Sequence, residues 1–256
     1  MIVAGLAIRN CREMSADRIG LMPDASPRVA RPRGRPRKDA EFAPTDTVMA
    51  AAIEAFSVHG YNGVSLRNVN AELGVSRNLL YQRFGSKADL WRAAVDWAFS
   101  PLLDYLEAAD DESADPMIRL RMLIRNFIEY SATRPYLARL INAEGAAATD
   151  RSDYLYRSYI RPVQRRFVPV FEQLRAQGRI KNIPPEIFYF LLTSGGTAPF
   201  GQRGLVSLIA PKLASPDDHQ VRLYAENVAD MLLNGLSLPT NEPGAVRTLD
   251  QGSPRH

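Results

Sequence analysis

The sequence predicts an all-α protein, and three observations support this prediction. Across residues 43–238, apolar residues recur three and four positions apart, the spacing that gathers side chains on one face of an α-helix. No stretch shows a convincing alternation of apolar and polar residues, the pattern of a half-buried strand. Glycine, proline and serine stand between the periodic stretches, where they end helices and begin new ones.

The first 42 residues carry the basic excess of the chain. Residues 1–40 hold nine Lys or Arg against four Asp or Glu, a net charge of +5, whereas the remaining 216 residues hold 23 against 24. This segment has four prolines and no sustained hydrophobic period, so we predict a disordered basic arm over residues 1–42. A localised basic block indicates a polyanionic partner, either nucleic acid or a membrane surface.

The centre of the arm is the run Arg33-Gly34-Arg35-Pro36, which resembles an AT-hook. Glycine lets the backbone approach the floor of a narrow A·T minor groove, proline keeps the chain extended, and the groove attracts arginine by its negative potential. The alternative is a solvated basic tail that attracts DNA nonspecifically. We favour a minor-groove arm because the run directly precedes the helical segments described next.

The first folded helix is predicted over residues 45–59. Its inward stripe is formed by Val48, Ala52, Phe56 and His59, with Ile53 and Ala55 beside it. Gly60 is expected to stop this helix, and Tyr61 to pack under the helices that follow.

A short helix is predicted next, over residues 66–73. Ser65 precedes it as an N-cap candidate, since its hydroxyl can accept a hydrogen bond from the free amides of the first turn. One apolar stripe is formed by Leu66, Val69 and Leu73. Gly74 is expected to end the helix, because glycine readily takes the left-handed conformation of a helix C-terminus.

A second short helix follows a tight turn, with Ser76 as its predicted N-cap and Gly85 as its end. Leu80 and Phe84, four positions apart, are expected to point into a core. The opposite face presents the polar side chains of Arg77, Asn78, Tyr81 and Gln82. A helix, a glycine-containing turn and a second helix with an exposed polar face form the helix-turn-helix pattern. The alternative is a helical hairpin whose polar face is merely hydrated.

The polar face suits the major groove of DNA, because Asn and Gln can read adenine and Arg can read guanine. The candidates for contacts with base edges are Arg77, Asn78 and Gln82. The candidates for contacts with phosphates are Ser65, Arg67, Ser76, Tyr81, Arg83 and Lys87. Lys87 is also the expected first residue of a helix capped by Ser86, where free amides favour an anion.

An ordered set of residues carries a family resemblance: Ala55-Phe56, Gly60-Tyr61, Gly63-Val64-Ser65-Leu66-Arg67, Leu73-Gly74-Val75-Ser76, Leu80-Tyr81 and Phe84-Gly85-Ser86-Lys87. With this set, residues 48–91 resemble the DNA-binding domain of the tetracycline-repressor (TetR) family of bacterial transcription regulators. Two residues, Asn70 and Leu73, depart from the family pattern, since small alanines are common at their positions. Arg83 stands where the family usually has His or Tyr, and it can still reach a phosphate.

The resemblance implies a three-helix helix-turn-helix domain over residues 43–92 and a helical ligand-binding and dimerisation domain over residues 93–238. It also implies a homodimer that binds a pseudo-palindromic operator in double-stranded DNA, most often a repressor released by a small-molecule effector, here unknown. In the family, the last two long helices of each subunit form a four-helix dimer interface. These helices would lie at about 184–200 and 217–236. The helix expected at 87–109 would connect the two domains.

Five further helices are predicted from apolar periodicity, near 115–133, 135–147, 151–178, 184–200 and 217–236. Pro101 predicts a kink or break in the connecting helix, and Pro162 and Pro169 predict bends. The small residues 194–198 would let helices approach closely, or their two glycines merely kink the helix. The tail, residues 239–256, is rich in Pro, Gly and polar residues and is predicted to be disordered.

Aromatic side chains of the second domain could line an apolar ligand pocket between helices. The candidates are Phe127, Tyr130, Tyr159, Phe167 and Phe188. Aromatic residues at helical spacing also serve as ordinary core, and that alternative stays open.

No catalytic residue, metal site or cofactor is predicted. His59, His219 and His256 are far apart in the sequence, and none forms a pair with metal-ligand spacing. The single cysteine, Cys11, excludes an internal disulfide and fits a reducing compartment. No apolar run is long enough to span a bilayer, so we expect a cytoplasmic protein without a membrane partner.

Two other functional classes remain as alternatives. One is a DNA-architectural protein that binds A·T-rich DNA mainly through its arginine-rich arm. The other is a small-molecule enzyme on a helical scaffold, which the motif search disfavours.

Overall fold

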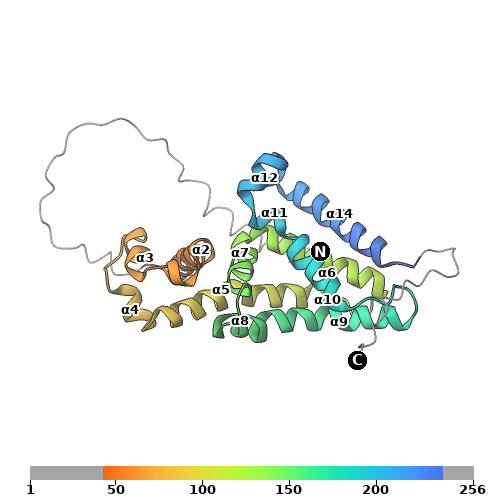
Figure 1. Cartoon of the computed structure of the whole chain (residues 1–256), viewed down its shortest axis with the longest axis horizontal. Coiled ribbons are helices and arrows are strands. Elements are labelled where there is room, and N and C mark those ends of the chain that lie inside the picture. Colours follow the sequence, from red (N-terminus) through yellow and green to blue (C-terminus); the bar gives the residue numbers. More distant parts are fainter. Residues whose placement is uncertain (1–42, 239–256) are drawn as a thin grey trace, which may run out of the picture. The chain divides into compact units, whose positions relative to one another are not determined.

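The computed structural model describes residues 43–238 (Figure 1). The predictions for the arm, residues 1–42 with Arg33, Gly34, Arg35 and Pro36, and for the tail, residues 239–256, lie outside the described residues.

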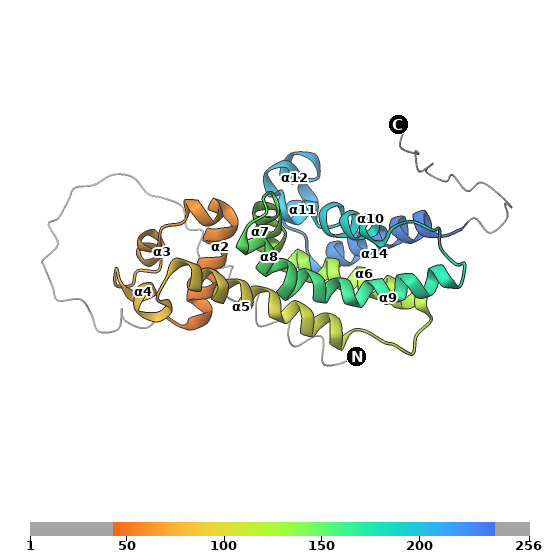
Figure 2. The ribbon, with the colours of Figure 1, turned by 60° about the horizontal axis from the view of Figure 1, so that its bottom comes forward.

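Four helices form the N-terminal part of the described chain: α2 (Thr45–Gly63), α3 (Leu66–Glu72), α4 (Leu79–Phe84) and α5 (Lys87–Ala108). Helices α2 and α4 both pack against α5, and α3 packs against α2 and α4 (Figures 1 and 2). Phe56, Leu80 and Trp91 lie almost fully buried in the core that these helices share. The apolar spacing read from the sequence therefore marks the faces that meet.

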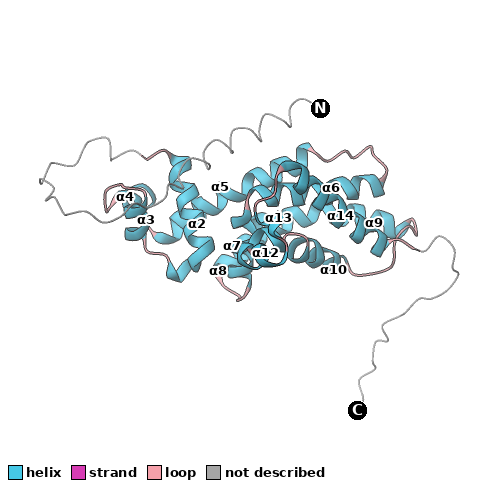
Figure 3. Ribbon diagram, turned by 90° about the horizontal axis from the view of Figure 1, so that it is seen from above, coloured by secondary structure: helices cyan, strands magenta, loops and turns pink. Residues whose placement is uncertain are grey.

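The remaining described elements are α6 (Pro116–Thr133), α7 (Pro135–Gly145), α8 (Asp150–Leu155), the π turn η2 (Tyr156–Ile160), α9 (Arg161–Ala176), α10 (Pro185–Phe190), the π turn η3 (Leu191–Gly195), α11 (Ala198–Gly201), α12 (Arg203–Ile209), α13 (Pro211–Ala214) and α14 (Asp218–Leu236). Helix α14 packs along α6, which also packs on α9. Residues 43–238 contain no strand beyond a single bridge between Ile180 and Ser237 (Figure 3). The all-α prediction is confirmed.

The end of α2 corrects one prediction. Gly60 leaves the helical conformation with a φ of 67°, as expected of a residue that stops a helix. His59, however, is exposed and does not belong to the buried stripe. Tyr61, which follows the turn at Gly60, stacks on Phe56 with ring centroids 6.0 Å apart and closes this end of the core instead.

The predicted caps are confirmed at one serine of three. The Ser86 hydroxyl accepts a hydrogen bond from the Asp89 N–H at 3.1 Å, and α5 begins at Lys87. Ser65 precedes α3, but its side chain makes no capping hydrogen bond. Ser76 is not the N-cap of the second helix, because α4 begins only at Leu79.

Neither Pro101 nor Pro169 interrupts its helix, so of the two outcomes predicted at Pro101 the break is excluded. Helix α5 is unbroken at Pro101, which lies on the exposed side, so the carbonyl group that loses its N–H partner can bond to water. Helix α9 likewise runs through Pro169. Ahead of Pro162 the chain forms the π turn η2, which was not predicted from the sequence.

The segment predicted as one helix near 184–200 is divided into α10, η3 and α11. Gly196 is buried under α14, since a Cβ atom there would lie 3.5 Å from Val228 and only 2.6 Å from the Leu192 carbonyl oxygen. The Tyr224 hydroxyl on α14 donates to the Gly196 carbonyl at 3.0 Å. The small residues therefore allow close helix approach within one chain.

Helices α12 and α13 occupy a stretch to which no element was assigned from the sequence. The apolar side chains of Leu205, Leu208 and Ile209 on α12 are exposed. Because this helix buries so little, no inward apolar stripe marks it in the sequence.

Candidate nucleic-acid interface

The candidate interface is built on the turn between α3 and α4. Gly74 takes a φ of 67° at the end of α3, a conformation that glycine adopts without steric cost. Leu66 and Val69 on α3 and Leu80 on α4 are buried against the core. The apolar sides of both helices are thereby fixed, and their other sides face outward.

Asn70 locks the two helices together. Its side chain is only 1% exposed. Its Nδ2 donates to the Arg77 carbonyl oxygen at 2.8 Å, and its Oδ1 accepts from the Leu80 N–H at 3.3 Å. Asn70 on α3 thus satisfies backbone groups at the start of α4, where neither Ser76 nor Asn78 supplies a side-chain cap. The sequence signal was its departure from the small residue usual in the family.

The candidates for base contacts lie at the start of α4 and on its outward face. Arg77, Asn78 and Gln82 are all exposed, and Arg77 and Asn78 directly precede the first residue of the helix. Helix N-terminal residues are the ones that reach base edges when a recognition helix enters the major groove. Tyr81, 58% exposed, shares this side of the helix.

The phosphate candidates flank this face. Ser65 and Arg67 are exposed at the start of α3, and Ser76 is exposed in the turn. Lys87 is the first residue of α5, and its Nζ lies 4.6 Å from the centroid of the Tyr61 ring. The ammonium group is therefore held at a helix N-terminus, where unpaired amides favour an anion.

Arg83 has partners inside the protein. Its guanidinium donates to the Ala43 carbonyl oxygen at 2.9 Å and to the Thr45 Oγ1 at 2.8 Å. It also lies over the Phe84 ring, 5.5 Å from the centroid. Arg83 therefore ties α4 to the start of α2, where the arm joins the described chain. These contacts were not predicted from the sequence.

The charge of the described helices is nearly balanced in this region. Residues 43–92 contain five Lys or Arg against four Asp or Glu, a net charge of +1, compared with +5 in residues 1–40. The basic residues are Arg67, Arg77, Arg83, Lys87 and Arg92. The basic excess of the chain therefore lies in the sequence of residues 1–40 and not in these helices.

Two residues on neighbouring helices, Trp97 and Arg139, fix α2 by polar contacts. The Trp97 Nε1 on α5 donates to the Asp46 Oδ1 at 3.0 Å. Arg139 on α7 pairs with Glu54 at 2.5 Å and donates to the Ser57 Oγ at 3.1 Å. Helix α2, against which α3 packs, is thus held by both α5 and α7.

The five aromatic ligand candidates lie in the hydrophobic core of the described chain. All are buried: Phe127, Tyr130, Tyr159, Phe167 and Phe188. Phe167 contacts Phe127 and Phe188 at centroid distances of 6.3 and 6.1 Å, as in an ordinary core. The apolar cavity beside Phe167 and Phe188 measures only about 10 Å³. Tyr159 lies elsewhere, with its hydroxyl on Asp96.

A larger groove of about 580 Å³ opens between α5, α6 and α9. It is lined by Leu103, Glu107, Asp110, Glu112, Arg119, Pro162, Arg165, Arg166 and Pro169. Several of its charges are paired within the groove: Arg119 with Asp110 at 2.6 Å and Arg166 with Glu107 at 2.7 Å. None of the aromatic candidates lines it.

Residues 43–238 contain neither a candidate metal site nor a candidate membrane span. No group of three or more His, Cys, Asp or Glu side chains in this range could hold a metal ion. No helix in the same range is long and apolar enough to cross a membrane.

Comparison with known sequences identifies the family. Residues 48–94 match the sequence model of bacterial regulatory proteins of the tetR family. Residues 113–242, about half of the chain, match that of the tetracyclin repressor-like C-terminal domain. The chain belongs to the TetR family. It is therefore a transcription regulator with a DNA-binding helix-turn-helix domain.

Individual relatives agree with this placement. The chain is 43% identical over 51 residues to the HTH-type transcriptional regulator YezE of Bacillus subtilis. The matched residues make up 20% of this chain and 26% of YezE. The match thus spans about a quarter of that relative. A solved TetR-family regulator from Rhodococcus RHA1 aligns over 79% of this chain and all of its own, with a TM-score of 0.56 and 18% identity.

A second solved structure, FadR of Bacillus subtilis in complex with stearoyl-CoA, aligns over 75% of this chain and 99% of its own. Its TM-score is 0.54 and its identity is 12%. At these identities the two solved structures show the shared fold alone.

Proposed function

We propose that this TetR-family regulator is a homodimeric repressor that binds a pseudo-palindromic operator through α4. The observation that carries the proposal is the outward polar face of Arg77, Asn78, Tyr81 and Gln82 on a helix whose other face is buried. A single α4 of six residues offers few contacts. Two copies related by a dimer axis would meet successive major grooves roughly 34–36 Å apart.

Dimerisation is supported by apolar side chains left exposed on the helices that correspond to the family interface. Ile187, Phe190 and Leu191, three and four positions apart, lie outward on α10 and at the start of η3. Leu223 and Met231 are exposed on α14, Met231 to 75%. An exposed apolar set of this kind marks a surface that another protein surface covers, and we assign a second copy of this chain to it.

Release by a small molecule completes the proposal. An effector weakens operator binding only as far as it prefers a conformation with wrongly spaced recognition helices. Similarity of fold to FadR, whose structure holds stearoyl-CoA, supports a ligand-responsive C-terminal domain but not a ligand class. Helix α5 begins directly after α4 and would transmit the change.

Selection from a random DNA pool, followed by footprinting of the selected sequence, tests the proposal. The expected result is a pseudo-palindrome protected in two half-sites about one helical turn apart. Enrichment of A·T-rich DNA without a palindrome would instead support an architectural protein that binds through its arm. Failure to select any sequence would contradict DNA recognition by α4.

Substitutions should separate base contacts from phosphate contacts. Asn78→Ala should relax preference at one operator position and cost about 1–3 kcal/mol on the selected site. Tyr81→Ala should weaken binding to all sequences alike, because a phosphate contact carries no sequence information. Binding to the selected operator and to scrambled DNA measures both. If Tyr81→Ala changed preference and Asn78→Ala did not, the assignment of contacts would be reversed.

Arg83 should act through the arm rather than through a phosphate of its own. Since its guanidinium holds Ala43 and Thr45, Arg83→Ala should loosen the attachment of the arm and weaken operator binding about fivefold. The same substitution in a chain lacking residues 28–38 should cost nothing further. Operator affinities of the four chains form a double-mutant cycle. If Arg83→Ala lowered operator affinity equally with and without residues 28–38, Arg83 would instead be assigned to a phosphate contact.

A further inference from the structure

Two tyrosine hydroxyls meet on one carboxylate in the middle of α5. The Tyr154 hydroxyl on α8 donates to the Asp96 Oδ1 at 2.6 Å, and the Tyr159 hydroxyl on η2 donates to the same oxygen at 2.5 Å. The Tyr159 hydroxyl also lies 3.5 Å from the Ser100 Oγ, one turn further along α5. Asp96 therefore joins α5 to the α8–η2 segment through two hydrogen bonds to a charged acceptor, which are stronger than neutral ones.

The π turn explains how both tyrosines reach the same atom. In a regular α-helix, side chains five positions apart, as Tyr154 and Tyr159 are, differ in direction by about 140°. A π turn, with hydrogen bonds between residues five apart, brings such positions toward one side. Here the Arg161 N–H donates to the Tyr156 carbonyl. Pro162 favours this wider turn, because in an α-helix its ring would clash with the carbonyl of Ser158.

The raised pKa values of Tyr154 and Tyr159 favour a lasting contact of both hydroxyls with Asp96. Burial, and next the hydrogen bond to Asp96, raises the pKa of Tyr154 to about 12. The same two causes, in the same order, raise the pKa of Tyr159 further. Both hydroxyls therefore stay protonated at neutral pH and remain hydrogen-bond donors.

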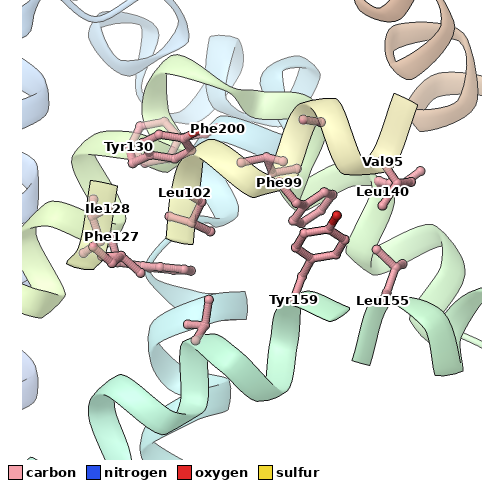
Figure 4. Packing of buried hydrophobic residues seen from close by; sticks show 14 of the residues in the cluster. Val95, Phe99, Leu102, Phe127, Ile128, Tyr130, Leu140, Leu155, Tyr159 and Phe200 are labelled. Carbon is pink, nitrogen blue, oxygen red and sulfur yellow. The ribbon is translucent and has the colours of Figure 1, made fainter. Parts of the chain in front are cut away.

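Aromatic rings continue the contact toward the DNA-binding helices. The Tyr159 ring packs on Phe99 of α5 with centroids 5.2 Å apart (Figure 4). The Tyr154 ring meets Trp91 at 5.9 Å, and Trp91 meets Tyr61 at 6.5 Å, both edge to face. Tyr61 is the ring against which Lys87 lies. An unbroken series of contacts thus runs from the carboxylate to the interface.

We propose that Asp96 is a positioning residue for operator binding: by holding α8 and η2 against α5, it sets the direction in which α5 carries α2, α3 and α4. In a dimer, that direction fixes the distance between the two copies of α4. The carboxylate therefore determines which spacing of operator half-sites the protein accepts. This inference rests on the proposed function, since spacing has meaning only for a dimer on a two-part site.

The test compares binding to one half-site with binding to complete operators whose half-sites are moved apart or together by single base pairs. Asp96→Ala should weaken binding to the selected operator about tenfold and flatten the dependence on spacing. Binding to the isolated half-site should stay within about twofold, because α4 itself is intact. Asp104→Ala, an exposed acid on the same helix, is the matched control and should change neither.

A double variant keeps the inference testable if Asp96→Ala fails to fold. Tyr154→Phe with Tyr159→Phe keeps both rings and removes only the hydroxyls, and it should reproduce the flattened spacing profile. Asp96→Asn keeps an oxygen acceptor and should restore most of the wild-type profile.

Two outcomes would overturn the inference. The first is an unchanged spacing preference in both the Asp96→Ala variant and the double tyrosine variant. The second is an equal loss of affinity for the half-site and for the full operator, which would indicate a purely structural role. A wild-type chain that binds half-sites but shows no spacing preference would overturn the proposed dimeric recognition itself.

Discussion

Asn70→Ala should lower the free energy of unfolding by about 2 kcal/mol and reduce operator affinity more than tenfold. The substitution leaves the Arg77 carbonyl and the Leu80 N–H without the side chain that bonds both, in a place where Asn70 is 1% exposed. It also opens space between α3 and α4. The start of α4, which carries Arg77 and Asn78, would then lose its fixed direction. Denaturant unfolding and operator titration measure the two effects.

Asn68→Ala is the matched control for this prediction. Asn68 lies two positions earlier on the same helix and is exposed. It should change stability by less than about 0.5 kcal/mol, as surface substitutions usually do. Asn70→Asp adds a second comparison, because it keeps an acceptor for the Leu80 N–H but cannot donate to the Arg77 carbonyl. Full operator affinity in Asn70→Ala would show that α4 is oriented by apolar packing alone.

Asn70 also shows how much of the candidate site could be predicted from the sequence. The polar outward face of α4 could be predicted, because residue spacing decides which side chains share a helix face. The partners of Asn70 and Arg83 could not be predicted, since both donate to backbone carbonyls that only the folded turn brings within reach. Ser76 was misjudged for the same reason: with Asn70 bonded to the start of α4, that helix needs no cap from the turn.

The fold was predictable where helices bury one regular face. The bounds of α5, α6 and α14 lie within one residue of those expected from periodicity and capping. The π turns η2 and η3 were missed, because a turn widened by one residue shifts the apolar spacing too little to be seen. Helix α12 was missed because three of its four large apolar residues are exposed, and α13 was missed because it has only four residues. Their existence depends on contacts, not on an amphipathic pattern.

Asp96 illustrates a limit of a different kind. In the sequence it is one acid among many on a helix, and its two tyrosine partners lie 58 and 63 positions away. Tyr159 was chosen from the sequence as a ligand candidate because of its ring, whereas the structure places its hydroxyl on a carboxylate. Only a contact between distant segments distinguishes these roles, and one sequence alone cannot reveal it.

Leu191→Glu should convert the protein to a monomer and weaken operator binding by at least about 100-fold, or about 2.7 kcal/mol. Leu191 is 54% exposed in the single chain and lies beside Phe190, which is 63% exposed. A dimer that covers this surface would have to bury two unpaired carboxylates at its centre, which costs several kcal/mol. Sedimentation velocity reports the change of mass, and titration with full and half operators reports the loss of paired binding.

Val58→Glu provides the control, since Val58 on α2 is 55% exposed and lies on none of the helices assigned to the interface. It should leave the dimer intact, which separates a surface-charge effect from an interface effect. Binding of the Leu191→Glu monomer to an isolated half-site should persist at wild-type strength, because α4 and Asn70 are untouched. A Leu191→Glu chain that still sediments as a dimer would place the subunit contact on another surface. The exposed apolar residues of α12 would then be the next candidates, because Leu208 and Ile209 are 80% and 79% exposed.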